Sequence, residues 1–101
     1  MPKKQQSPIE MWQKCKAEYG GSIILVRVGD FFETYEQDAL TCQAILGLTI
    51  TTRLKGSDVL AMAGFPHQVI DDKLSKLIKA GQRVGIVEWI PYKSENKPQK
   101  V

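Results

Sequence analysis

Two adjacent phenylalanines and a carboxylate, Phe31, Phe32 and Glu33, closely follow the most strand-like run of the sequence, residues 23–28. A phenyl ring can act as an apolar wedge, and a carboxylate accepts hydrogen bonds. Two phenylalanines after a strand are more often core residues. Consecutive residues leaving a strand point in opposite directions, however, so both rings cannot enter the same core. We therefore expect one ring to remain outside, where it could wedge into a partner beside Glu33.

The sequence lacks the residue patterns of the common enzyme classes. His67 is the only histidine, there is no Gly-x-Ser-x-Gly segment and no Cys/His pair in register, so a hydrolase triad has no components. A phosphate-binding Gly-x-x-x-x-Gly-Lys-Ser/Thr loop is also missing. The acidic residues Asp30, Glu33, Glu36 and Asp38 could hold Mg²⁺ as in a nuclease, but such residues more often stabilise the start of a helix. We expect no enzymatic activity, no metal and no cofactor.

The elements that must position these residues belong to one domain. The chain has 101 residues, 43% of them apolar and 25% charged, which is typical of a globular protein. The predicted folded domain spans residues 7–91. It lies between a disordered basic N-terminus, residues 1–6, and a flexible lysine-containing tail, residues 92–101.

The basic charge of the chain lies at its ends. The net charge is +3, but residues 7–92 contain nine Lys or Arg against ten Asp or Glu, a net charge of −1. Basic groups normally supply most non-specific affinity for nucleic acid. If the folded part binds DNA alone, we expect it to bind weakly.

Hydrophobic periodicity predicts three helices around a sheet. The helices are expected over residues 8–19, from about Tyr35 to Leu46, and from Ile70 to Gly81. Strands are expected over residues 23–28 and 83–90, and a hairpin over residues 48–53 and 59–63, joined by the turn residues 55–58. This pattern indicates an α/β or α+β fold, with a mixed sheet of about four to six strands flanked by about three helices.

The cysteines and the N-terminus indicate a cytoplasmic protein. Cys15 and Cys42 fall on predicted apolar helix faces and have no zinc-site partners, so we expect buried, reduced thiols, with a disulfide as the minor alternative. The first residues have no apolar signal region, and no apolar run approaches the ~18 residues needed to cross a bilayer.

Five segments together resemble the N-terminal mismatch-recognition domain, domain I, of the MutS family of DNA mismatch repair proteins. Gly29-Asp30-Phe31-Phe32-Glu33, with Tyr35 and Asp38-Ala39 after it, is similar to the Gly-Asp-Phe-Tyr-Glu stretch of that domain. The other similar segments, in order, are Ser7-Pro8 with a helix carrying Lys16, residues 48–53, Met62-Ala63-Gly64-Phe65-Pro66, and the helix from Leu74 to Gly81 with the strand 84–88 after it.

The resemblance implies that Phe31 inserts beside a mispaired base and that Glu33 hydrogen-bonds to it. An apolar wedge costs a few kcal/mol of unstacking, and that cost falls where pairing is already faulty. A carboxylate next to phosphates becomes tolerable when a base N–H donates to it, or when it is protonated and donates to a ring nitrogen. Phe32 takes a variable position and is expected to face the core.

Three further residues are candidates for DNA-backbone contacts. Arg53, Lys55 and His67 lie in segments that resemble ones near DNA in the family, although solvated surface is an equal alternative. His67-Gln68 departs from the Tyr-His usual in the family. The expected partner is double-stranded DNA with a mismatch or small bulge, and other mismatch-repair proteins are possible partners, but no membrane and no small-molecule substrate.

The alternative to DNA binding is a protein-interaction or regulatory module that kept the fold, which the near-neutral folded part favours. A full MutS protein continues into connector, lever, clamp and ATPase domains, and its ATP binding belongs to those later parts. This chain is therefore expected to be either an excised fragment or a small stand-alone homologue. Its lysine-bearing ends favour the stand-alone protein.

Overall fold

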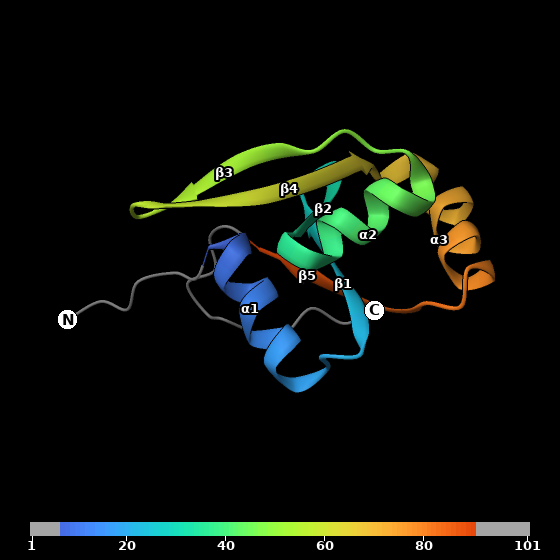
Figure 1. Cartoon of the computed structure of the whole chain (residues 1–101), viewed down its shortest axis with the longest axis horizontal. Helices are drawn as coiled ribbons and strands as arrows, with labels where there is room; N and C mark the ends of the chain where they lie inside the picture. Colours follow the sequence, from blue (N-terminus) through green and yellow to red (C-terminus); the bar gives the residue numbers. More distant parts are fainter. Residues whose placement is uncertain (1–6, 91–101) are drawn as a thin grey trace.

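The fold is a five-stranded mixed sheet with helices on both faces (Figure 1), seen in a computed structural model that describes residues 7–90. The predicted disordered ends, residues 1–6 and 92–101, lie outside the described residues. The elements in chain order are α1 (Pro8–Glu18), β1 (Ser22–Val28), β2 (Phe31–Tyr35), α2 (Glu36–Leu46), β3 (Thr51–Lys55), β4 (Asp58–Pro66), the 3₁₀ turn η1 (His67–Val69), α3 (Ile70–Lys79) and β5 (Arg83–Trp89). This α+β architecture confirms the predicted fold class.

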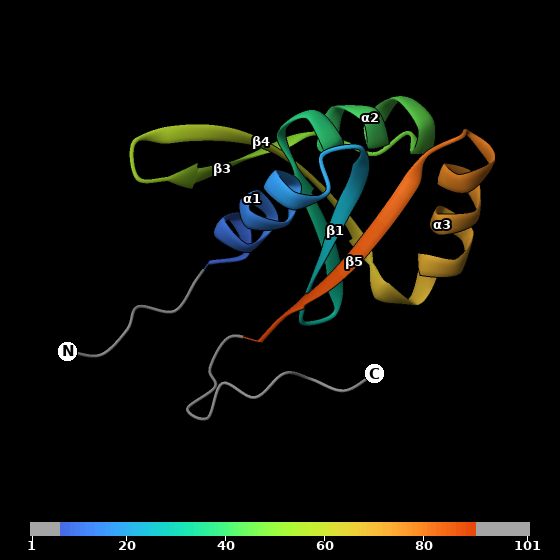
Figure 2. The same cartoon turned by 90° about the horizontal axis from the view of Figure 1, so that it is seen from below.

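The strand order in the sheet is β3-β4-β2-β1-β5. Strand β1 pairs in parallel with β5, with Ser22 opposite Arg83 and Val28 opposite Trp89. The other three pairings are antiparallel, and the β3–β4 hairpin projects beyond the helices (Figure 2). The central position of β1 and β2 explains why β1 is buried from Ile23 to Val26.

Most predicted elements are present, but one strand was missed. Residues 31–35 were expected to lead from a strand into a helix, yet they form β2, and the helix begins at Glu36. Gly29 adopts a positive φ of 60° and makes a two-residue turn with Asp30, so that Val28 pairs with Phe31. The chain therefore reverses direction at this turn. Strands β1 and β2 form a hairpin in place of the predicted connection from a strand to a helix.

The predicted second hairpin is confirmed with different limits. Its first strand was expected at residues 48–53 but lies at Thr51–Lys55, and its second strand extends to Pro66 rather than Ala63. The extension occurs because β4 pairs with β2 along its far half, from Met62 opposite Tyr35 to Pro66 opposite Phe31.

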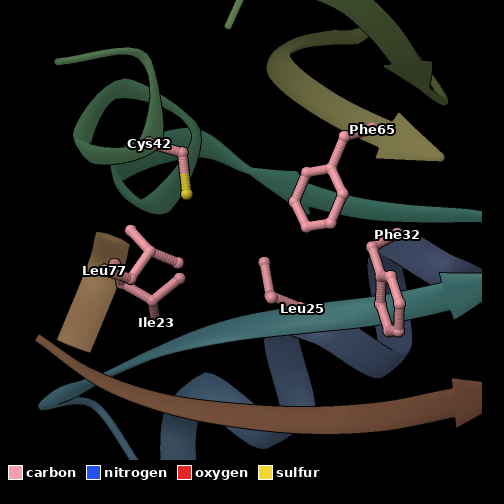
Figure 3. Packing of buried hydrophobic residues seen from close by; sticks show 6 residues of the cluster. All are labelled: Ile23, Leu25, Phe32, Cys42, Phe65 and Leu77. Atoms are coloured by element: carbon pink, nitrogen blue, oxygen red, sulfur yellow. The ribbon is translucent and has the colours of Figure 1, made fainter. Parts of the chain in front are cut away.

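Two apolar clusters hold the helices on opposite faces of the sheet. Helix α1 places Ile9 and Trp12 against Ile24, Val26 and Tyr35. On the other face, α2 and α3 contribute Cys42 and Leu77 to a cluster with Ile23, Leu25, Phe32 and Phe65 (Figure 3). Cys42 is buried as expected, whereas Cys15 is only half-buried, and both thiols are free. None of the helices within residues 7–90 is long and apolar enough to span a membrane.

A buried carboxylate ties α1, β1 and α2 together. Asp38, 3% exposed, accepts hydrogen bonds from Trp12 Nε1 at 3.1 Å, from the Ile24 amide at 3.0 Å and from Lys16 Nζ at 2.9 Å. A buried carboxylate is stable when opposite charge and hydrogen-bond donors surround it in this way. Asp38 therefore has a structural role, and it fixes the start of α2 directly after β2.

Candidate nucleic-acid interface

The β1–β2 turn lies at the end of the sheet opposite α2 (Figure 2), and the two phenylalanines beside it have opposite environments. The ring of Phe32 enters the core and is 5% exposed, with its centroid 5.7 Å from that of Phe65 (Figure 3). Phe31 is 49% exposed. This arrangement confirms that one ring faces the core and the other remains outside.

Phe31, Glu33 and Tyr35 share one face of β2, because side chains alternate along a strand. On this face α1 covers Tyr35, which is fully buried, while Phe31 lies at the uncovered end. An exposed apolar ring, a half-buried carboxylate and a buried phenol therefore follow one another from the edge of the site toward the core.

Both carboxylate oxygens of Glu33 contact other side chains. Tyr35 Oη donates to Oε1 at 2.5 Å, and Arg53 Nη2 donates to Oε2 at 3.3 Å. The side chain of Glu33 is only 14% exposed, and that of Arg53 is 39% exposed. The carboxylate is thus held in place and partly compensated in charge, which lowers its repulsion of a nearby phosphate.

The environment of Tyr35 keeps its hydroxyl protonated. Burial raises the pKa of Tyr35 far above its ordinary value, and the hydrogen bond to Glu33 and the charge of that carboxylate raise it further. Arg53 acts in the opposite direction and is the smallest influence. The hydroxyl therefore remains a hydrogen-bond donor to Glu33 across the ordinary pH range.

Gly64 allows the strands to approach closely beside Glu33. It pairs with Glu33 across β2 and β4, and a Cβ atom added there would lie 2.8 Å from the Phe32 carbonyl oxygen and 3.7 Å from Glu33 Cγ. Such a Cβ would clash with the backbone of β2.

The three predicted backbone-contact residues occupy different places. Arg53 contacts Glu33, as described above. His67 follows Pro66, which pairs with Phe31, and its amide donates to the Asp30 carbonyl at 2.8 Å, so it lies beside the turn. Lys55 ends β3 at the tip of the projecting hairpin, where it pairs with Asp58, and is not part of this cluster. The structure thus places Phe31 and His67 beside the β1–β2 turn. Arg53 lies further along the sheet, opposite Leu60, and its side chain reaches back to Glu33.

The four acidic residues considered for Mg²⁺ do not converge. Asp38 is buried under α1, Glu33 contacts Tyr35 and Arg53, and Glu36 Oε2 accepts from the Ala61 amide at 3.1 Å. The side chain of Asp30 is 86% exposed in the turn. Within residues 7–90, no group of three or more His, Cys, Asp or Glu is arranged to hold a metal ion.

Sequence reasoning missed Tyr35 and Gly64 as parts of this site. Tyr35 was assigned to the face of a helix, and its contact with Glu33 follows only from the strand geometry of β2. The period-two spacing of Phe31, Glu33 and Tyr35 was the signal that could have revealed it.

Comparisons with known proteins show the family of this chain. The family model described as MutS domain I matches residues 6–100. The proteins named DNA mismatch repair protein MutS from Flavobacterium johnsoniae and Bacteroides thetaiotaomicron are 44% and 47% identical over 88 and 76 residues, which are 86% and 74% of this chain. The same-named protein from Salinibacter ruber is 42% identical over 83 residues, 81% of this chain. The chain belongs to the MutS domain I family.

The matched part is a small share of each relative. It covers 10% of the Flavobacterium johnsoniae protein and 9% of each of the other two proteins. The chain therefore spans about a tenth of the length of the curated relatives that it matches.

Proposed function

We propose that this chain is a non-enzymatic DNA-binding module of mismatch repair that recognises duplex DNA at a mismatch or small bulge. The observation that carries this proposal is the exposed ring of Phe31, which stands at an uncovered end of the sheet while its neighbour Phe32 is in the core. Membership of the MutS domain I family supports a role in mismatch recognition.

Phe31 acts as the wedge. Inserting an apolar side chain between base steps unstacks them and kinks the duplex, at a cost of a few kcal/mol. The cost is lower where the bases are already mispaired or bulged, so the deformability of the duplex selects the site. The turn that carries Phe31 is held on its other side by the contact between the His67 amide and the Asp30 carbonyl, which limits the motion of the wedge.

Glu33 acts as the reader of the mispaired base. Its place two residues along β2 puts it on the same face as Phe31, and its carboxylate is held by Tyr35 and Arg53. A carboxylate that faces phosphates lowers affinity for any duplex, whereas a base N–H that donates to it recovers part of that loss. Glu33 therefore contributes discrimination rather than general affinity.

In this proposal the chain alone has a low affinity for duplex DNA of any sequence. The described residues carry nine basic and ten acidic side chains, so electrostatic attraction to phosphates depends on local groups such as Arg53, Lys55 and His67. Other mismatch-repair proteins would then supply the remaining contacts with DNA.

A second candidate is a protein-interaction module, which the projecting β3–β4 hairpin favours. Leu54 and Val59 are opposite each other in its register and are 68% and 63% exposed. Exposed apolar side chains of this kind are common at protein interfaces. This function would not require Phe31 or Glu33 to touch DNA.

Fluorescence anisotropy with matched, G·T-mismatched and single-base-bulge duplexes, at two salt concentrations, separates the two candidates. The wild type is expected to prefer the defective duplexes, and Phe31→Ala is expected to lose that preference. Tyr19→Ala is the matched control, because Tyr19 is a 59% exposed aromatic residue near the other end of β1. Glu33→Ala should bind the matched duplex more tightly and show a smaller preference.

Equal, salt-sensitive binding by the wild type and Phe31→Ala, or no binding at all, would favour the interaction module. An equal loss of affinity for matched and mismatched duplexes in Glu33→Ala would contradict the reader role of Glu33.

A further inference from the structure

The two side chains that hold Glu33 differ in their freedom to move. Tyr35 is fully buried, and its ring packs edge-on against Trp12 at a centroid distance of 6.0 Å. Its hydroxyl is 2.5 Å from Oε1 of Glu33. To withdraw from the carboxylate, this ring would have to leave the cluster that it forms with Ile24 and Val26.

Arg53, in contrast, is free to exchange its partner. It lies on the edge strand β3, its side chain is 39% exposed, and its Nη2 atom is 3.3 Å from Oε2 of Glu33. A partly exposed ion pair of this kind contributes little stability, so a competing anion can replace the carboxylate at modest cost. A guanidinium also binds phosphate well.

Resting on the proposed function, we propose that Tyr35 is a positioning residue for Glu33, its fixed support, and that Arg53 is the exchangeable counter-ion of the carboxylate. In the free protein, Arg53 neutralises the carboxylate and occupies Oε2. When DNA binds, Arg53 turns to a backbone phosphate, and Oε2 becomes free to accept a base N–H. Tyr35 keeps Oε1 in place throughout, so the vacated oxygen has a defined direction.

The two roles predict different binding defects. Tyr35→Phe removes only the hydroxyl, so the carboxylate loses its orientation, and we expect the preference for a defective duplex to fall about fivefold to tenfold with little change on matched DNA. Arg53→Gln removes the counter-ion and the phosphate contact together. We expect it to weaken matched and mismatched binding by a similar factor and to leave the preference in place.

Matched controls separate these effects from general ones. Tyr19→Phe removes an exposed hydroxyl, and Arg83→Gln removes an exposed positive charge from the far end of β5. Neither residue lies near Glu33, so both variants are expected to bind like the wild type. An effect of Arg83→Gln equal to that of Arg53→Gln would show that net charge alone sets affinity, and would overturn the role of Arg53.

A double-mutant cycle tests whether Tyr35 acts through Glu33. If it does, Tyr35→Phe should have no further effect on the preference in a Glu33→Ala background. A DNA-free readout accompanies the cycle: proton NMR should detect the hydroxyl proton of Tyr35, and Glu33→Ala should shift it or lose it through faster exchange. A residue with only a packing role would give the same loss in both backgrounds.

The outcomes distinguish this inference from the proposed function. If the wild type prefers defective duplexes and Phe31→Ala loses that preference, but Tyr35→Phe retains it, the inference is overturned and the proposed function stands. If the wild type shows no preference, both are overturned, whatever the NMR signal shows. If Tyr35→Phe reduces the preference only when Glu33 is present, the positioning role is supported.

Discussion

Phe31 and Phe32 show how one residue step along a strand separates a surface role from a core role. The same side chain is 49% exposed at one position and 5% exposed at the next. The sequence alone predicted this division, because consecutive side chains on an extended backbone point to opposite faces. It did not reveal which partners the buried ring would meet.

We predict that only one of the two alanine substitutions strongly lowers stability. Phe32→Ala removes a ring from the cluster with Phe65 and Leu25, and should lower the free energy of unfolding by about 3–5 kcal/mol. Phe31→Ala removes a half-exposed ring and should change it by less than about 0.5 kcal/mol. Urea unfolding followed by circular dichroism measures both, and similar losses in the two variants would contradict the assignment of faces.

At the level of elements, the β2–β4 pairing positions the candidate reader. Glu33 pairs with Gly64, and the absence of a side chain there lets the two strands approach. Glu36, the first residue of α2, has a positive φ of 52°, a conformation that costs about 1–3 kcal/mol in non-glycine residues. Its carboxylate accepts from the Ala61 amide of β4, which offsets part of that strain where β2 gives way to α2.

Gly64→Ala is expected to disturb both stability and the site. The new methyl group would lie 2.8 Å from the Phe32 carbonyl oxygen, so β2 and β4 must separate at a cost of about 1–3 kcal/mol. We expect a lower unfolding midpoint and shifted amide resonances at Glu33 and Phe32 in NMR spectra. Gly21→Ala is a suitable control, because a Cβ atom there meets no atom within 4 Å. Unchanged resonances in Gly64→Ala would argue against the close approach.

The sequence predicted the long elements better than the short one. Helix α3 carries the spacing of Ile70, Leu74 and Leu77 over three turns, and it was predicted at nearly its observed limits. Strand β2 has five residues, and its Glu33 with the acidic residues after it suggested the start of a helix. The pair of Glu33 and Arg53 joins residues 20 positions apart, so only the observed sheet places them together.

At the scale of the whole molecule, one face of the sheet carries the candidate site and the other carries an apolar cluster. Helix α1 and the buried Asp38 brace the face that carries Tyr35 and Glu33. The opposite face holds the cluster of Cys42, Leu77 and Phe65 under α2 and α3. The candidate site lies at the uncovered end of the first face. The sheet that carries it is held by helices packed on both of its faces.

The packing around Cys42 changes the pKa of its thiol, and this change makes the stability of the domain depend on pH. Burial is the main cause that raises its pKa from 9.0 to about 11, and the charge of Asp38 adds to it. The unfolded chain loses this proton near pH 9, while the folded protein keeps it until about pH 11. The contribution of the thiol to stability is therefore complete below pH 9 and is lost as the pH rises toward 11.

We expect the free energy of unfolding to fall between pH 8 and pH 10, and to fall less in Cys42→Ala, which has no thiol to titrate at this position. Urea titrations of both proteins at the two pH values measure the difference. At pH 8 a thiol reagent should label Cys15 before Cys42, since Cys15 is half-buried and Cys42 is fully buried. An identical pH dependence in the two proteins would contradict the burial of Cys42 as described.

The most direct test of the central claim is the fluorescence of 2-aminopurine placed next to a G·T mispair. Insertion of the Phe31 ring unstacks the neighbouring base, so wild-type protein at saturating concentration should increase the fluorescence, and Phe31→Ala should not. An equal increase with both proteins, or bound wild-type protein with no increase, would contradict the wedge.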